Sequence, residues 1–208
     1  MTTNASLHAL VRRQLIDLDL EESIKHSVMD HHVPGLQYLN LSRSDKFTLK
    51  LYLIEGARND QSGFLIHPHS HRYDFNTVVL AGKVQNTVFK EGLEGGRDST
   101  RHSMVRLDYS PENGLAKSGP PVCLRETAES GVFGVRESYF LNCKQIHTLK
   151  VWPDATLLCL SQFEDKRESS SLYLPPRHQL DPITSRQPSM VELKDLRARC
   201  LELVEANL

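Results

Sequence analysis

The stretch GFLIHPHSHRYDF, residues 63–75, continues through NTVVLAG to Gly82 and places three imidazoles two residues apart, at His67, His69 and His71. Successive side chains of a β-strand alternate between its faces, so an extended backbone here would direct all three imidazoles the same way. Such a row packs poorly in a core, whereas neutral imidazole nitrogen is a favoured ligand for iron, zinc, copper and nickel. A solvated strand face is the alternative interpretation.

A further histidine, His147, lies far along the chain in YFLNCKQIHTL, residues 139–149, where it enters another β-like run. Interior positions of separate strands converge in the mouth of an antiparallel barrel, so a distant strand can complete a site there. We therefore predict that His69, His71 and His147 bind one metal ion, with His67 as a substitute ligand.

The rest of the chain supports a β-rich fold with helical ends. Short apolar runs bounded by Gly and Pro are typical of a sandwich or barrel. The intervening segments 90–101, 110–131 and 164–189 are polar and rich in Gly or Pro, so we predict loops there. The predicted strands are 36–41, 47–54, 63–68, 75–80, 83–89, 104–109, 134–141, 147–151 and 156–163.

Apolar residues recur at three- and four-residue spacing near both termini, which predicts helices there. We expect a helical N-terminal segment over residues 5–30 and a C-terminal helix over about residues 190–206. The length of 208 residues suits one well-buried core. The prediction is a single domain, 1–208, whose barrel spans about residues 36–175.

The two histidine segments resemble the motifs of the cupin superfamily. The first cupin motif is written G-x5-HxH-x3,4-E-x6-G, and Gly63, His69, His71 and Gly82 keep its spacing. Phe75 stands where the glutamate ligand is usual. The resemblance implies a mainly β fold, a cupin-type double-stranded β-helix (jelly-roll barrel) with N- and C-terminal helices.

The second cupin motif, P-x-G-x2-H-x3-N, is degraded in this chain. Only His147 is kept, because Asn142 and Lys144 replace the usual Pro and Gly, and Val151 replaces the usual Asn. The resemblance extends over roughly residues 45–163 and is carried mainly by the first motif.

The resemblance also implies a chemistry. Three neutral histidines leave a divalent metal with its full charge and with open positions. Among cupins, three-histidine ferrous sites are typical of thiol dioxygenases and diketone dioxygenases. The implied cofactor is therefore Fe(II), and the implied activity is a non-haem iron dioxygenase reaction of O₂ with a small polar substrate such as a thiol. The chain departs from the thiol enzymes because it has no matching tyrosine for a cysteine cross-link near Phe75.

Two alternatives remain open at this stage. One is a non-catalytic cupin that binds a ligand, and the other is a cupin lyase or isomerase that uses Zn, Ni or Mn. No arginine aligns with the residue that binds a substrate carboxylate in thiol dioxygenases. Arg106 and Arg136, both in predicted strands, are candidates for that task through bidentate contacts.

Asp74 and Tyr139 are the candidate catalytic residues. Asp74 can hold a ligand imidazole by accepting its hydrogen bond, or enter as a fourth ligand; the alternative is an ion pair with Arg72. If the strand that contains Tyr139 continues regularly, then Tyr139, Cys143 and His147 share one face. The Tyr139 phenol can then donate to substrate or dioxygen, unless the backbone satisfies it. Cys143 is either a thiolate ligand or a small buried apolar residue.

Composition bounds the partners. The formal net charge is −1 and the pI near 6.8, which gives no indication of a nucleic-acid or membrane partner. There is no apolar run of membrane-spanning length and no signal-peptide core. Four cysteines without a CxxC pair favour a reducing, cytoplasmic location. The expected partners are a small-molecule substrate and O₂, in a monomer or homodimer.

Overall fold

The computed structural model describes residues 4–60, 63–92, 101–110, 114–117, 121–163, 169–176 and 185–208. Its helices are α1 (Asn4–Ile16), α2 (Leu20–Ile24) and α3 (Met190–Glu205). Its strands are β1 (Leu36–Arg43), β2 (Phe47–Ile54), β3 (Phe75–Ala81), β4 (Lys83–Gly92), β5 (Arg101–Ser110), β6 (Gly114–Lys117), β7 (Val122–Glu126), β8 (Gly131–Gly134), β9 (Ser138–Leu141), β10 (Ile146–Val151), β11 (Thr156–Phe163) and β12 (Ser170–Leu174).

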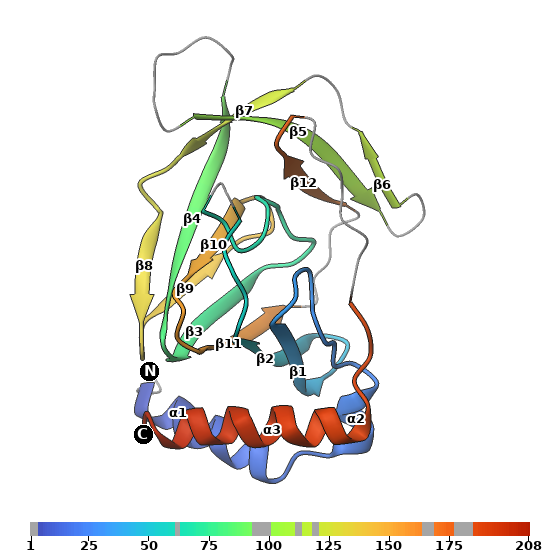
Figure 1. The fold of residues 1–208 in the computed structure, drawn as a ribbon, viewed down its shortest axis with the longest axis vertical. Coiled ribbons are helices and arrows are strands. Elements are labelled where there is room, and N and C mark those ends of the chain that lie inside the picture. Colours follow the sequence, from blue (N-terminus) through green and yellow to red (C-terminus); the bar gives the residue numbers. More distant parts are fainter. Residues whose placement is uncertain are drawn as a thin grey trace.

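The strands form two curled antiparallel sheets. One has the order β1-β2-β11-β3-β9, and the other has the order β10-β4-β7-β5-β12, with β6 beside β5 and β8 beside β4. The helices lie together across the outer side of the first sheet, below it in Figure 1. The predicted fold class, a mainly β barrel with helices at both ends, is confirmed.

The central strands of the first sheet, β2, β11 and β3, are largely buried on both faces, which explains their mostly apolar sequences. On β2, Leu49, Leu51 and Leu53 face outward and pack with buried residues of α1 and α3, among them Leu15 and Leu193. The alternate residues of β2 face the barrel interior, where Ile54 joins a separate core. The helices therefore cover a sheet face that would otherwise be solvent-exposed.

The interior core lies between the two sheets and beside the histidines. Phe75 and Val79 of β3, Leu158 of β11, and Val84 and Val88 of β4 are buried in it. The tight connection from β3 to β4 uses Gly82 at φ +71°. A Cβ there would lie 2.5 Å from the carbonyl oxygen of Ala155, so the glycine of the first motif is required by this turn.

Some predicted elements differ from the observed ones. Residues 63–68 form no strand and follow an irregular path, because Gly63 has φ +81° and Pro68 lacks an amide hydrogen. The predicted strand 134–141 is interrupted at Arg136, whose φ is +71°, and only β9 remains of it. The predicted loop 110–131 contains β6 and β7, and the predicted loop 164–189 contains β12.

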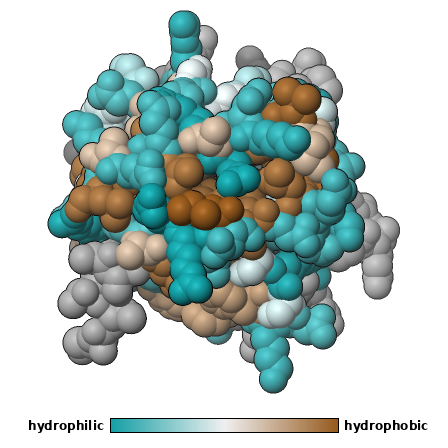
Figure 2. Space-filling model, turned by 90° about the horizontal axis from the view of Figure 1, so that it is seen from below, coloured by the Kyte–Doolittle hydropathy of each residue, from teal (hydrophilic) through white to brown (hydrophobic). Residues whose placement is uncertain are grey.

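The helical side of the molecule carries apolar side chains among polar ones, and Figure 2 views it from that side. Leu10 and Ile16 of α1 and Val191 of α3 are among the exposed large apolar residues. α3 begins with a capping box, in which Ser189 and Glu192 satisfy each other's backbone amides. Among the described residues, no helix has the length and apolarity needed to cross a membrane.

Candidate metal centre

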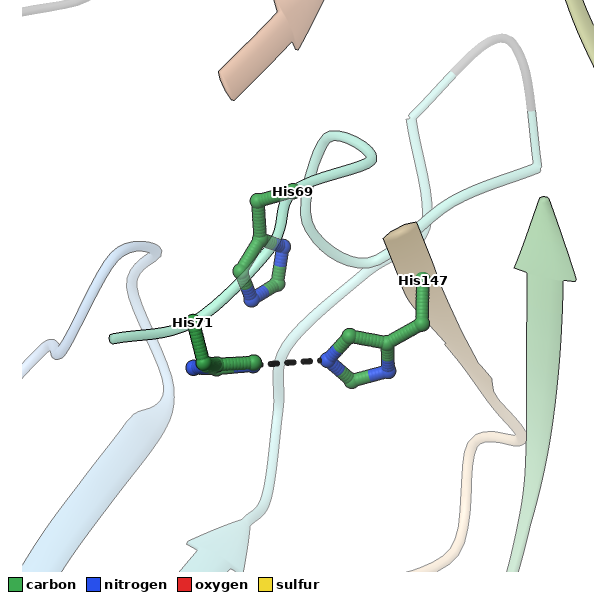
Figure 3. A group of neighbouring side chains, drawn as sticks. All are labelled: His69, His71 and His147. Atoms are coloured by element: carbon green, nitrogen blue, oxygen red, sulfur yellow. Dashed lines mark hydrogen bonds between the residues drawn. The ribbon is translucent and has the colours of Figure 1, made fainter. Parts of the chain in front are cut away.

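His69, His71 and His147 come together inside the barrel. Their candidate ligand nitrogens all lie within 4.8 Å of one another, and His147 is 3% exposed. The Nε2 atoms of His71 and His147 are 2.9 Å apart. Figure 3 shows the three imidazoles converging on one space from two separate segments of the chain. The residues that the sequence singles out as a metal site are therefore neighbours in space.

The segment that carries His69 and His71 is fixed by backbone hydrogen bonds to both sides. The amide of His69 donates to the carbonyl of His147 at 2.9 Å, and the reverse bond is 2.8 Å. On the other side, the amide of Ser70 donates to Ser171 and that of Tyr173 donates to Pro68, both at 2.8 Å. The segment thus joins β10 to β12, the two edge strands of the second sheet.

Hydrogen bonds at the far nitrogens orient two of the imidazoles. His147 Nδ1 lies 2.7 Å from Oδ1 of the buried Asn86, and His69 Nδ1 lies 2.9 Å from the carbonyl oxygen of His67. Because both oxygens can only accept, each Nδ1 carries the hydrogen and each Nε2 keeps its lone pair. The Nε2 of His147 then accepts a hydrogen bond from Nε2–H of His71.

The three imidazoles are neutral near pH 7. Burial is the main cause that lowers the pKa of His69, and it holds the pKa values of His71 and His147 well below their usual range. The neighbouring histidines add to this effect, and for His71 so does the positive charge of Lys50. Neutral imidazole is the form that binds a metal.

The donor set fits a first-row divalent metal. Two nitrogens bound to one ion at about 2.1 Å each lie at most about 4.2 Å apart, so the widest pair needs only a small side-chain movement. The pair formed by His71 and His147 already satisfies that limit. In the structure, a hydrogen atom lies between Nε2 of His71 and Nε2 of His147. A metal ion bound by both histidines would replace that hydrogen and accept both Nε2 lone pairs.

The histidines open into a small, mostly apolar cavity of about 20 Å³, which has room for about one water molecule. A substrate larger than water therefore requires the walls to move. None of the described residues that line the cavity is acidic. The lining consists of His32, Leu36, Tyr52, Ile66, His69, His71, Phe75, Tyr139, His147, Leu149, Leu158 and Leu160.

Of the two candidate catalytic residues, Tyr139 lines this cavity and Asp74 does not. Tyr139 is 8% exposed, and burial raises the pKa of its phenol, so that it remains a hydrogen-bond donor. The Asp74 carboxylate accepts the backbone N–H of Cys143 at 2.6 Å and thereby fixes the turn before β10.

His67 and Cys143 lie outside the cluster. The His67 ring lies near Asp60, with 3.7 Å between Nδ1 and Oδ2, and the His67 carbonyl oxygen lies 2.9 Å from Nδ1 of His69. The expectation that residues 67, 69 and 71 share one face is wrong, because this segment is not a regular strand. Cys143 lies in the turn between β9 and β10, so the regular strand expected from residue 139 to residue 147 does not form.

The two candidate anion-binding arginines contact other groups. Arg106 forms ion pairs with Asp108 at 2.9 Å and Glu91 at 3.1 Å. Arg136 donates to the backbone carbonyls of Asn207 and Leu208. Neither lines the cavity.

Sequence reasoning missed several residues around the centre. One is Asn86, whose Oδ1 accepts the hydrogen bond from Nδ1 of His147. The sequence feature that could have indicated it is a single polar residue between Val84 and Val88 on the interior face of β4. His32 lines the cavity at φ +69°, with its ring centroid 6.0 Å from that of His69. His32 is exposed at its outer side, but loss of solvent around its ring and the neighbouring His69 lower its pKa to about 4, so it is a further neutral imidazole beside the centre.

Replacing Asn86 with alanine is expected to weaken metal binding about 10- to 100-fold, the usual effect of removing a hydrogen bond that orients a ligand. Asn86→Asp, which keeps the acceptor oxygen, should restore most of the affinity. A competitive chelator titration measures both. Gln85→Ala, on the opposite face of β4, is the control, and an unchanged affinity in Asn86→Ala would contradict the role of Asn86.

Comparisons with known proteins show likeness in fold alone. No protein-family model matches the sequence, and no curated protein is a significant match. A crystal structure of Fe(II) HppE is 10% identical over 67% of this chain and 57% of that chain, with a TM-score of 0.38.

Two further structures are similar at the same level. An RmlC-like cupin from Shewanella frigidimarina NCIMB 400 is 13% identical, over 67% of this chain and 86% of that chain, with a TM-score of 0.38. Hydroquinone 1,2-dioxygenase PnpCD, in complex with Cd²⁺ and 4-hydroxybenzonitrile, is 11% identical over 70% and 71%, with a TM-score of 0.38.

Proposed function

We propose that this protein is a mononuclear non-haem iron enzyme that uses O₂ to oxidise a small polar substrate such as a thiol. The observation that carries the proposal is the convergence of His69, His71 and His147, three neutral donors within 4.8 Å in a cavity lined by no described acidic residue. Ferrous iron bound there supplies open coordination positions for substrate and dioxygen. A thiol substrate would bind as its thiolate and leave as a sulfinate.

The chain's own residues would orient and shield these reactants. Asn86 and the His67 carbonyl hold two imidazoles with their Nε2 lone pairs toward the centre. Tyr139, protonated in its buried position, can donate a hydrogen bond to a bound oxygen atom. Asp74 would act indirectly, by fixing the turn that leads to His147.

Phe75 is central to the choice of chemistry. Its ring lies 4.6 Å from that of His71, between centroids, and it fills with an apolar group the position that resembles the glutamate site of the cupin motif. A metal held here keeps its full charge, because no carboxylate in the described lining neutralises it. Leu158, Leu160 and Leu149 complete an apolar wall that keeps bulk water from the reactants.

The test is metal analysis of anaerobically purified protein, followed by O₂ uptake with a panel of small thiols and diketones. We expect one iron per chain, substrate-dependent O₂ consumption, and loss of that consumption after removal of iron with a chelator. Re-addition of Fe(II), but not Zn(II), should restore it. Full-occupancy zinc without O₂ uptake would contradict the proposal and favour a lyase or isomerase, and a protein without any metal would favour a ligand-binding cupin.

We further propose a cytoplasmic location and a single domain. All four cysteines are free thiols, and three of them, Cys123, Cys159 and Cys200, are buried. Free buried thiols support a reducing compartment. We expect a monomer or a homodimer, and a measurement of the molecular mass in solution distinguishes the two.

A further inference from the structure

His32 lies between the cavity at the three histidines and the solvent. Of the described residues that line this cavity, His32 alone is exposed, and the others are buried or partly buried. Its ring centroid lies 6.0 Å from that of His69. The His32 side chain therefore meets the cavity on one side and water on the other.

The connection that carries His32 has a fixed base and a lightly held tip. At the base, Oδ1 of Asp30 accepts the amide hydrogen of Gly35, and the amide of Asp30 donates to Oε1 of Gln37, both at 2.9 Å. The amide of His32 donates to Oγ of Ser185 at 3.4 Å, beyond the roughly 3.2 Å that usually limits such a bond. His32 is thus held less firmly than the residues at the base of its connection.

The imidazole of His32 is held by ring contacts. Its centroid lies 3.9 Å from that of His31, and within the described part of the chain neither of its nitrogens has a hydrogen-bond partner. Rotation of the His32 side chain away from the cavity would therefore break no hydrogen bond of the ring.

The other walls of the cavity are harder to displace. Leu149, Leu158 and Leu160 are buried residues of the paired strands β10 and β11. His69 is joined by backbone pairing to His147 and to β12. Displacement of these walls would break sheet hydrogen bonds or open the packed interior, and rotation of the His32 side chain requires neither.

The cavity of about 20 Å³ has room for about one water molecule, so a larger ligand enters only when a wall moves. We propose that His32 is the gate of the metal site: its side chain closes the cavity, and its displacement admits ligands and limits their size. This inference rests on the proposed function, since it takes a metal at the three histidines as given. It assigns His32 as a specificity-determining residue.

A gate has a measurable effect on ligand affinity. The apparent affinity of a ligand that fits only the open state is reduced by the fraction of molecules that are open, so an open fraction of about one in ten costs about tenfold. A slender ligand that tolerates the closed position is affected much less. Removal of the gate should therefore strengthen the binding of bulky ligands selectively.

The probes are azide, a rod one atom wide, and imidazole, a bulkier ring, each titrated into the Co(II)-loaded protein and followed by visible absorption. We expect His32→Ala and His32→Asn to strengthen imidazole binding at least about tenfold and azide binding less than about threefold, with an unchanged cobalt content. Two shorter side chains are used so that one remains informative if the other fails to fold, and asparagine tolerates a positive φ.

Two further variants separate size from chemistry. His32→Phe restores the bulk of the ring without a nitrogen, so it should bind both probes like the wild type. Pro34→Ala, at an exposed position of the same connection, is the matched control and should also be unchanged.

Unchanged imidazole affinity in both shortened variants, or an equal change for the two probes, would overturn the gate and leave the metal site standing. Loss of cobalt from all the His32 variants would also overturn it, by identifying His32 as a fourth ligand. Failure of the wild type to retain cobalt would instead overturn the proposed function and the inference with it.

Discussion

Replacing His147 with alanine is expected to abolish metal retention, with an affinity loss of at least about 100-fold. The substitution removes one of three ligands and also leaves the buried Oδ1 of Asn86 without its 2.7 Å partner. It further removes the 2.9 Å hydrogen bond between the Nε2 atoms of His71 and residue 147. Elemental analysis after gel filtration measures the effect directly.

The control for this experiment is His26→Ala, because His26 contacts Glu22 on the surface and takes no part in the cluster. It should bind metal like the wild type. The loss of a buried hydrogen-bonded group costs about 1–3 kcal/mol of stability, so folding of His147→Ala has to be checked separately. Circular dichroism measures whether the variant is folded. Stoichiometric metal in the folded variant would remove His147 from the site and end the enzyme proposal.

The largest expected loss of stability outside the metal centre comes from Gly82→Ala. The added Cβ would lie 2.5 Å from the Ala155 carbonyl oxygen and 3.1 Å from Cα of Thr156, at a φ of +71° that alanine disfavours. Left-handed strain and overpacking together should lower the free energy of unfolding by about 3 kcal/mol or more. Thermal or urea unfolding measures the change.

Gly56→Ala separates the two contributions. Gly56 has a similar φ of +74°, but nothing lies within 4 Å of the added Cβ, so only the strain of about 1 kcal/mol remains. Equal losses in the two variants would mean that the backbone at Gly82 moves to relieve the clash. Any Gly82→Ala protein that remains folded should keep its metal, because Gly82 does not line the cavity at the three histidines.

The three histidines were predictable because their positions can be recognised from short stretches of sequence alone. HxH within the first motif is a local pattern, and His147 stood out as a lone histidine entering an apolar run. Asn86 was not predicted because its role exists only when β4 lies beside β10, a long-range pairing that no local pattern specifies. His32 belongs to a connection whose backbone is set by tertiary contacts, with positive φ at Asp30, His32 and Gly35.

The buried, inward position of Lys50, which is 3% exposed, was not predicted from the sequence for a different physical reason. In β2 the leucines at 49, 51 and 53 form the more apolar face, and alternation alone suggests that this face lines the barrel. In the structure those leucines pack on the terminal helices, and the face with Lys50 and Tyr52 turns inward. Because α1 and α3 cover the outer face of the first sheet, the more apolar face of β2 packs against the helices and not against the barrel interior.

The segment that joins β10 to β12 has a consequence beyond chemistry. An antiparallel sheet with free edges offers unpaired amides and carbonyls to any other extended chain, which is a route to aggregation. By pairing with His147 on one side and Leu172 on the other, His69 covers part of both edge strands of the second sheet at once. The segment that carries two of the imidazoles therefore also leaves fewer unpaired backbone groups for the addition of a foreign strand.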